Sequence, residues 1–164
     1  MSSTSSIEIR PAESNDAPAI AFLLAEAFAE YVSLYTPEGY AATAIRPEEM
    51  VRRIEDGPVW VSISGGLIVG TVSVMLKGKS LYVRGMAVLP AARGQRIGEL
   101  LLAQVERFAA SKGIRRLFLS TTPFLDRAIR LYENRGFQRI DEGPHDLFGT
   151  PLFTMEKVIQ RDRP

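Results

Sequence analysis

The sequence of 164 residues contains no cysteine and one histidine, His145. Without cysteine the chain forms no disulfide and no cysteine–metal site, and it has no cysteine nucleophile. A single histidine also disfavours a zinc or multi-histidine site, so we expect no metal. Because His145 stands in the segment "GPHDLFG", we interpret it as a loop residue rather than a base. Any catalysis must use tyrosine, carboxylate, lysine, serine or main-chain groups.

The sequence also has little net charge. Its 20 basic and 19 acidic residues leave a formal charge of +1, whereas nucleic-acid binders usually carry a clear basic excess. We therefore expect no nucleic-acid partner. We find no apolar run long enough to cross a bilayer and no secretory leader, so we expect no membrane association and a cytoplasmic location.

The first third of the chain predicts a strand and two helices. Residues 7–12 alternate like a strand, and Ser14 and Asn15 are candidate N-caps of the helix that follows. Residues 37–45 read as an irregular connection. Pro47 suits the first turn of a second helix, "PEEMVRRIED".

The middle of the chain predicts three strands and a helix. "PVWVSIS", the turn "GG" and "LIVGTVSVML" form a hairpin pattern, and "SLYVRGMAVLP" is a further strand. Gly85 within that strand indicates a bulge or a close backbone approach. From Ile97 the apolar period becomes helical, until Lys112 and Gly113 end the helix.

The last part predicts a strand at "RLFLST", a helix from Pro123 to Gly136, and strands at "FQRI" and "LFTMEKV". The predicted order is β-α-α-β-β-β-α-β-α-β-β, which is an α/β protein with a mixed sheet covered by helices. We expect residues 7–159 to form a single domain, between a disordered tail of residues 1–6 and a tail of residues 160–164.

The hexapeptide "RGQRIG", Arg93 to Gly98, stands where a predicted strand leads into a helix. A helix start offers unpaired N–H groups and a positive dipole end, which suit a phosphate. By itself the segment is more typical of a basic, solvated turn. It matches neither the dinucleotide fingerprint nor the nucleotide P-loop.

Two stretches, "MAVLPAARGQRIGELLL" and "AIRLYENRGF", together resemble the GNAT superfamily of N-acetyltransferases. The first is similar to the acetyl-CoA motif [Q/R]-x-x-G-x-[G/A], and the second to A-x-x-L-Y-x-x-x-G-F. Two positions depart from the family pattern. Arg96 stands where the first motif has its first glycine, and Leu125 stands where many members have asparagine.

The resemblance implies where acetyl-CoA binds. Main-chain N–H groups of the loop would hold the pyrophosphate, with Arg93 adding charge at the rim. Strands would splay apart beside "RGMAV", which leaves main-chain groups free for the pantetheine arm, and the N–H of Val88 would stabilise the developing oxyanion. The residues implied in cofactor binding are Met86, Ala87, Val88, Arg93, Gly94, Gln95, Arg96, Ile97, Gly98, Glu99 and Tyr132.

Two expectations follow for the loop. Arg96 should keep an ordinary negative φ, as a residue at a helix start does. A side chain at Gly98 should intrude between the loop and the pyrophosphate.

Tyr132 is implied as the group that assists the departing thiolate. The alternative is a core aromatic on an amphipathic helix. A free tyrosine, with a pKa of about 10, is a weaker acid than a thiol near 8.5, so full proton transfer is uphill by about 2 kcal/mol. We therefore expect a hydrogen bond to sulfur, with proton transfer completed late.

The need for a base depends on the acceptor amine. At pH 7 the neutral form costs about 4.6 kcal/mol for a lysine-like amine and about 1 kcal/mol for an α-amine. Candidate substrate residues are Glu26, Glu30, Tyr31 and Tyr82, besides a water chain, although each carboxylate alone is more typical of a solvated surface. Arg84 either binds a substrate carboxylate or forms an internal salt bridge.

We therefore predict an N-acetyltransferase that moves an acetyl group from acetyl-CoA to a small amine or a peptide amine in a ternary complex. A non-catalytic acyl-CoA sensor on the same fold and a nucleotide-binding module are the alternatives. A longer acyl donor and a homodimer are left open.

Overall fold

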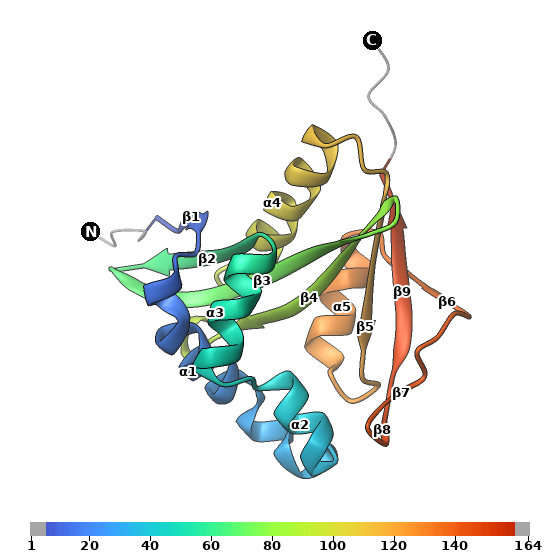
Figure 1. The fold of residues 1–164 in the computed structure, drawn as a ribbon, viewed down its shortest axis with the longest axis horizontal. Helices are drawn as coiled ribbons and strands as arrows, with labels where there is room; N and C mark the ends of the chain where they lie inside the picture. The colour runs from blue at the N-terminus through green and yellow to red at the C-terminus, as the bar shows by residue number, and fades with distance from the viewer. Residues whose placement is uncertain (1–5, 160–164) are drawn as a thin grey trace.

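The computed structural model describes residues 6–159, so most of the predicted tails, residues 1–5 and 160–164, lie outside the described residues. Seven strands form one sheet in the order β1-β2-β3-β4-β5-β9-β6 (Figure 1). Neighbouring strands are antiparallel except β4 and β5, which are parallel. The strands are β1 (Glu8–Pro11), β2 (Val59–Ser64), β3 (Leu67–Lys77), β4 (Ser80–Val88), β5 (Arg116–Thr121), β6 (Gln138–Ile140) and β9 (Phe153–Val158).

Five α-helices and three short 3-10 helices connect these strands in the described part of the chain. They are η1 (Ser14–Asp16), α1 (Ala17–Phe28), η2 (Ala29–Leu34), α2 (Pro37–Thr43), α3 (Pro47–Asp56), η3 (Pro90–Ala92), α4 (Ile97–Ser111) and α5 (Asp126–Asn134). The predicted mixed α/β fold class is confirmed.

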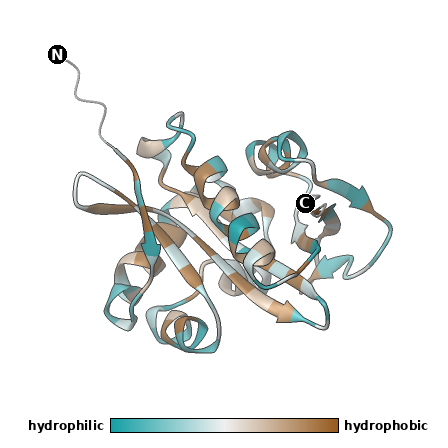
Figure 2. Ribbon diagram, turned by 90° about the horizontal axis from the view of Figure 1, so that it is seen from above, coloured by the Kyte–Doolittle hydropathy of each residue, from teal (hydrophilic) through white to brown (hydrophobic). Residues whose placement is uncertain are grey.

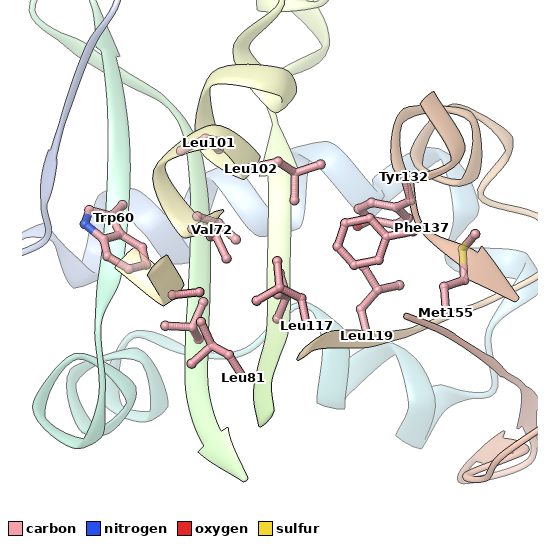
Figure 3. Packing of buried hydrophobic residues seen from close by; sticks show 14 of the residues in the cluster. Trp60, Val72, Leu81, Leu101, Leu102, Leu117, Leu119, Tyr132, Phe137 and Met155 are labelled. Carbon is pink, nitrogen blue, oxygen red and sulfur yellow. The ribbon is translucent and has the colours of Figure 1, made fainter. Parts of the chain in front are cut away.

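Two hydrophobic clusters lie on opposite faces of the sheet. Helices α1 and α3 pack on one face, where Val59 and Val61 of β2 join their cluster. Helices α4 and α5 cover the other face, where Trp60 belongs to the second cluster. Figure 2 shows hydrophobic residues along the central strands between these helices, and Figure 3 shows part of the second cluster. Val59, Trp60 and Val61 are all buried but on alternating faces, because successive side chains of a strand point to opposite sides of the sheet.

The sheet splits between β4 and β5. Only Ser80–Tyr82 of β4 pair with Arg116–Phe118 of β5. Beyond them β4 is paired with β3 alone, and the rest of β5 is paired with β9. The two strands visibly diverge in Figure 1. The splay that the family resemblance implied is therefore present, and β4 has an open edge from Val83 to Val88.

The bulge predicted at Gly85 is also confirmed. Ser73 faces Arg84 and Thr71 faces Ala87, so two residues of β4 stand opposite one of β3. Gly85 has a φ of 64°, which glycine adopts without strain. The extra residue shifts the phase of the strand. As a result Ala87 joins the α1–α3 cluster, whereas Met86 packs against the α4–α5 cluster.

Three parts of the prediction need correction. Residues 37–45 contain α2. The Thr36 hydroxyl caps this helix by accepting a hydrogen bond from the Gly39 N–H at 3.0 Å. The helix has no apolar stripe, so its sequence shows no helical period of hydrophobic residues. Helix α5 begins at Asp126 rather than Pro123, because Leu125 is not helical (ψ 69°). A hairpin of β7 (Asp146–Leu147) and β8 (Thr150–Pro151) was not predicted.

The start of α1 also differs from the prediction. Ser14 and Asn15 are not its N-caps but lie within η1, which precedes it. The carboxylate of Asp16 accepts a hydrogen bond from the Glu13 N–H at 2.7 Å and pairs with Arg10 at 2.8 Å. Asp16 therefore organises this turn.

The segment Ser14–Leu34 is long and apolar enough to cross a membrane, since an 18-residue window within it has a mean hydropathy of 1.4. The prediction that no run has this length is therefore wrong, because η1, α1 and η2 join into one continuous helical segment. In the fold, α1 buries Ile20, Leu23 and Leu24 in the cluster with α3 and β2. Core packing thus uses the apolar face of this helix.

Glu106 joins α4 to two other elements of the second half of the fold. Its carboxylate pairs with Lys157 of β9 at 2.7 Å and with Arg135, which follows α5, at 2.8 Å. Burial raises the pKa of Glu106, but the hydrogen bonds from Lys157 and Arg135 outweigh this effect and hold the pKa below its ordinary value of 4.5. The ionised carboxylate therefore stabilises the packing of α4.

We expect Glu106→Gln to lower the free energy of unfolding at pH 7 by about 1–3 kcal/mol, because two partly buried cations lose their counter-charge. The folded pKa lies below the unfolded one, so this contribution is present above about pH 4.5 and is lost as the pH falls. Urea unfolding at pH 7 and at pH 3 should show a smaller difference from wild type at the lower pH. The exposed Glu133→Gln is the control, and an equal loss there would contradict the assignment.

Candidate active site

Two cavities open where β4 and β5 separate. The first, of about 370 Å³, lies between the end of β4, the β4–α4 loop, α5 and the end of α1. The second, of about 250 Å³, lies between the middle of β4, the end of β5 and the α2–α3 region. Four residues line both cavities: Phe28, Met86, Leu125 and Tyr132. The cavities therefore meet at these side chains.

The first cavity brings together nearly all of the predicted cofactor-binding residues. Gln95 is exposed and does not line it. The predicted residues that do line it are Met86, Ala87, Val88, Arg93, Gly94, Arg96, Ile97, Gly98, Glu99 and Tyr132.

The loop into α4 contradicts the prediction for Arg96. Its φ is 59° and its ψ 26°, in the left-handed region. Arg96 is the N-cap and thus the last loop residue, whereas the prediction treated it as the first helical one. A residue with a Cβ pays about 1–2 kcal/mol in this conformation, and glycine avoids that cost. The glycine of the family motif at this position therefore has a conformational reason.

The prediction for Gly98 is also corrected. A Cβ at Gly98 would lie 2.7 Å from Cδ2 of Leu131, so it points at α5. The glycine allows α4 and α5 to approach closely. Gly70 of β3 has a similar role beneath α4, since a Cβ there would lie 2.9 Å from Cγ2 of Ile97. The start of α4 is thus seated tightly between β3 and α5.

The open edge of β4 presents main-chain groups to the first cavity. The N–H of Leu89 donates to the carbonyl of Val69 on β3 at 2.8 Å. Main-chain groups alternate in direction along a strand, so the N–H of Val88 is directed to the opposite, unpaired edge. That N–H is free to bind a ligand between the strands.

Tyr132 lies at the junction of the cavities and is 7% exposed. Its ring is 5.8 Å from that of Phe137, and Figure 3 shows both beside Leu119 and Met155. Burial raises the pKa of the Tyr132 hydroxyl well above its ordinary value, and Tyr35 raises it further. The hydroxyl therefore stays protonated in the folded protein over the neutral range.

Glu30, a candidate substrate residue, is engaged elsewhere. Its carboxylate accepts a short hydrogen bond from Arg93 and pairs with Arg127 at 3.4 Å. The bond from Arg93 is the main reason why the pKa of Glu30 lies below its ordinary value. Glu30 lines neither cavity. A carboxylate held ionised by two arginines is a weak base.

The other candidate substrate residues do not line one common cavity. Tyr82 and Arg84 line the second cavity, and Tyr31 lines the first. Glu26 is exposed on α1 and lines neither cavity.

The second cavity is rich in arginine and hydroxyl groups. Arg84 of β4 and Arg53 of α3 line it together with Tyr35, Tyr82 and the end of β5. No aspartate, glutamate or histidine is among its lining residues. Within residues 6–159, no cluster of three or more histidine or carboxylate side chains is placed to hold a metal ion.

Sequence reasoning missed Arg53 and Arg127. Arg53 stands on the polar side of a helix that shows only a modest apolar stripe, and Arg127 lies in the first turn of α5. Both look like solvated helix residues in the sequence. Their positions beside the cavities depend on how α3 and α5 pack.

Comparisons with known proteins agree with this geometry. The sequence model of the Acetyltransferase (GNAT) family matches residues 20–137, which is most of the chain. A probable N-acetyltransferase family 8 member 5 of Mus musculus is 38% identical over 89 residues, which cover 51% of this chain and 39% of that protein. The chain thus matches well under half of that relative's length.

An uncharacterised N-acetyltransferase of Escherichia coli, YjgM, is 33% identical over 133 residues, which cover 77% of this chain and 78% of that protein. The crystal structure of PaiA N-acetyltransferase from Thermoplasma acidophilum in complex with coenzyme A has the same fold, with a TM-score of 0.80 at 20% identity; the match covers 93% of this chain and 99% of that one. From the family match and the Escherichia coli relative, the chain belongs to the GNAT family of acetyltransferases.

Proposed function

We propose that this protein transfers an acetyl group from acetyl-CoA to a small primary amine, by direct attack of the amine in a ternary complex. The observation that carries the proposal is the meeting of two cavities at Tyr132 and Met86, beside the open edge of β4. One cavity would hold the donor and the other the acceptor, so that both reactants meet in one place.

The first cavity fits the donor. Its mouth is the start of α4, where unpaired N–H groups and the helix dipole favour phosphate, and Arg93 and Arg96 add positive charge. The open edge of β4 offers main-chain partners to an extended amide-containing arm. The similar Thermoplasma acidophilum structure holds coenzyme A, which supports this assignment.

Two groups would act on the reacting thioester. The free N–H of Val88 would donate a hydrogen bond to the carbonyl oxygen, where negative charge develops. The hydroxyl of Tyr132 would donate to the departing sulfur. Because its pKa is raised by burial, Tyr132 keeps its proton until late and acts mainly as a hydrogen-bond donor.

The second cavity fits a small acceptor. Its volume of about 250 Å³ lies below the range of about 300–1,000 Å³ that is usual for drug-sized ligands, which favours a small amine over a peptide. No carboxylate lines it to take the proton of the amine, so a water chain would do so. Arg53 and Arg84 give this cavity a positive charge.

Thiol release from acetyl-CoA, followed over a panel of primary amines, tests the function. We expect release that depends on the amine, and calorimetric binding of coenzyme A in the micromolar range with a raised melting temperature. Binding of acetyl-CoA without thiol release for any amine would instead support a sensor. Preference for ATP or NAD over coenzyme A would support a nucleotide-binding module.

We expect Tyr132→Phe to lower the single-turnover rate about tenfold to a thousandfold while acetyl-CoA affinity stays nearly the same, because the hydroxyl acts in the transition state. Tyr40→Phe is a matched control, since Tyr40 lines neither cavity. Equal rates in wild type and Tyr132→Phe would make Tyr132 a core aromatic only.

Substitutions at positions 96 and 98 of the loop should change the stability of the protein in opposite directions. Arg96→Gly removes left-handed strain, so we expect the free energy of unfolding to rise by about 1 kcal/mol. It also removes a charge, so coenzyme A binding should weaken modestly, more at low salt than at high salt. Thermal unfolding and calorimetry at two salt concentrations measure both effects.

Gly98→Val should lower both stability and coenzyme A affinity at any salt concentration, because its side chain meets Leu131. The double variant Gly98→Val with Leu131→Ala should recover part of the stability. Unchanged stability in Gly98→Val would show that α4 and α5 do not need this close approach.

A further inference from the structure

Two arginines, Arg53 and Arg84, line the second cavity, and the nearest acidic side chain that acts on Arg53, Glu49, lies on the same helix outside the cavity lining. Within residues 6–159, neither Arg53 nor Arg84 forms an ion pair with a carboxylate. The Nε atom of Arg84 is buried and has no hydrogen-bond partner among the described residues. The internal salt bridge that the sequence left open for Arg84 is therefore not formed.

Arg53 of α3 also reaches β4 next to Arg84. Nη1 of Arg53 lies 2.8 Å from the position that a Cβ of residue 85 would occupy, directly beside Arg84 on β4. Burial, and after it the positive charge of Arg84, lower the pKa of Arg53 to about 10. Two like charges held together away from bulk water are unfavourable unless an anion joins them.

A third buried polar group lies in the same cavity. Thr122 is 2% exposed, and its hydroxyl has the Tyr35 hydroxyl nearby, but within residues 6–159 no atom meets strict hydrogen-bond geometry with it. Buried polar atoms without partners are rare in folded proteins and call for an explanation. A polar ligand in the second cavity supplies one, because Arg84 and Thr122 both line it.

The positive charge of the second cavity favours an anionic ligand. Apart from the two arginines, its polar side chains are the neutral hydroxyls of tyrosine, serine and threonine. Guanidinium groups bind carboxylates through paired, charge-assisted hydrogen bonds. The small volume leaves room for one compact molecule.

We propose that the acceptor is a small amino acid, that is, an amine that also carries a carboxylate, and that Arg84 and Arg53 bind this carboxylate. This inference rests on the proposed function, because it places the amine end of the same molecule at the junction with the first cavity. Met86 follows Arg84 by two residues on β4 and lines both cavities. The arginines are thus positioned to orient the amine toward Tyr132.

The transfer is balanced without any further reactant. The nitrogen of the neutral amine forms a bond to the thioester carbonyl carbon, and the carbon–sulfur bond breaks. The nitrogen gives up one proton, and the departing sulfur gains one to become the free thiol. The products are an N-acetylamino acid and coenzyme A.

The test compares matched pairs of acceptors. Each of the common amino acids is paired with its carboxamide, which keeps the side chain and the amine but lacks the negative charge. For the amino acids that react, we expect kcat/KM in thiol release to be at least 30-fold higher than for the carboxamide. Equal values for the two members of each pair would overturn the inference while leaving the proposed function in place.

Arg84→Gln and Arg53→Gln then test the residues. In each variant the ratio of kcat/KM between amino acid and carboxamide should fall toward one, mainly through a higher KM for the amino acid. Arg52→Gln is the matched control, because Arg52 is exposed next to Arg53 on α3, and it should retain the wild-type ratio. A wild-type ratio in both Arg84→Gln and Arg53→Gln would overturn the assignment of the carboxylate to these side chains.

Calorimetry separates the two proposals and shows whether the variants fold. Each variant should bind coenzyme A like the wild type. If the wild type binds coenzyme A but releases no thiol with any amine, the proposed acetyl transfer fails. Binding of amino acids to the coenzyme A complex then tests the inference about the site. We expect amino acids to bind this complex at least tenfold more tightly than their carboxamides. Equal binding would overturn the inference.

Discussion

The short pairing between β4 and β5 is the constraint on which the site depends. Three residues of each strand are paired, and beyond them β3 holds β4 while β9 holds β5. An open strand edge inside a sheet leaves main-chain hydrogen bonds unmade, so the gap favours a ligand that completes them. Because the gap lies between strands that are distant in the sequence, it brings Met86 and Tyr132 to one place.

The bulge at Gly85 gives β4 a different role on each side of it. Without the extra residue, Arg84 and Met86 would point to the same face of the sheet. With it, Met86 packs on the α4–α5 side while Ala87 takes its place on the α1–α3 side. Gly85 also leaves room for the guanidinium of Arg53. One backbone irregularity thus sets which face Met86 and Ala87 occupy and leaves space for Arg53 beside β4.

The loop into α4 shows that one sequence motif can depend on several physical causes. Arg96 stands at a position that favours glycine because of its left-handed backbone, and Gly98 is small because α5 passes close by. This chain accepts the strain at Arg96 and gains a cation at the mouth of the first cavity. Glu30 lies outside this cavity and pairs with Arg93 and Arg127, which line it.

The sequence by itself determined the strands from β2 to β5, helix α4 and the presence of an irregularity at Gly85, because these depend on short-range periodicity and on the backbone freedom of glycine. It also carried the paired motifs of the family. Only the tertiary structure decided that Glu30 meets Arg93, that Arg53 and Arg84 line one cavity, and that Tyr132 stands between two cavities. Such contacts join residues from different elements, so they depend on how helices and strands pack, and local patterns of hydrophobicity do not encode that packing.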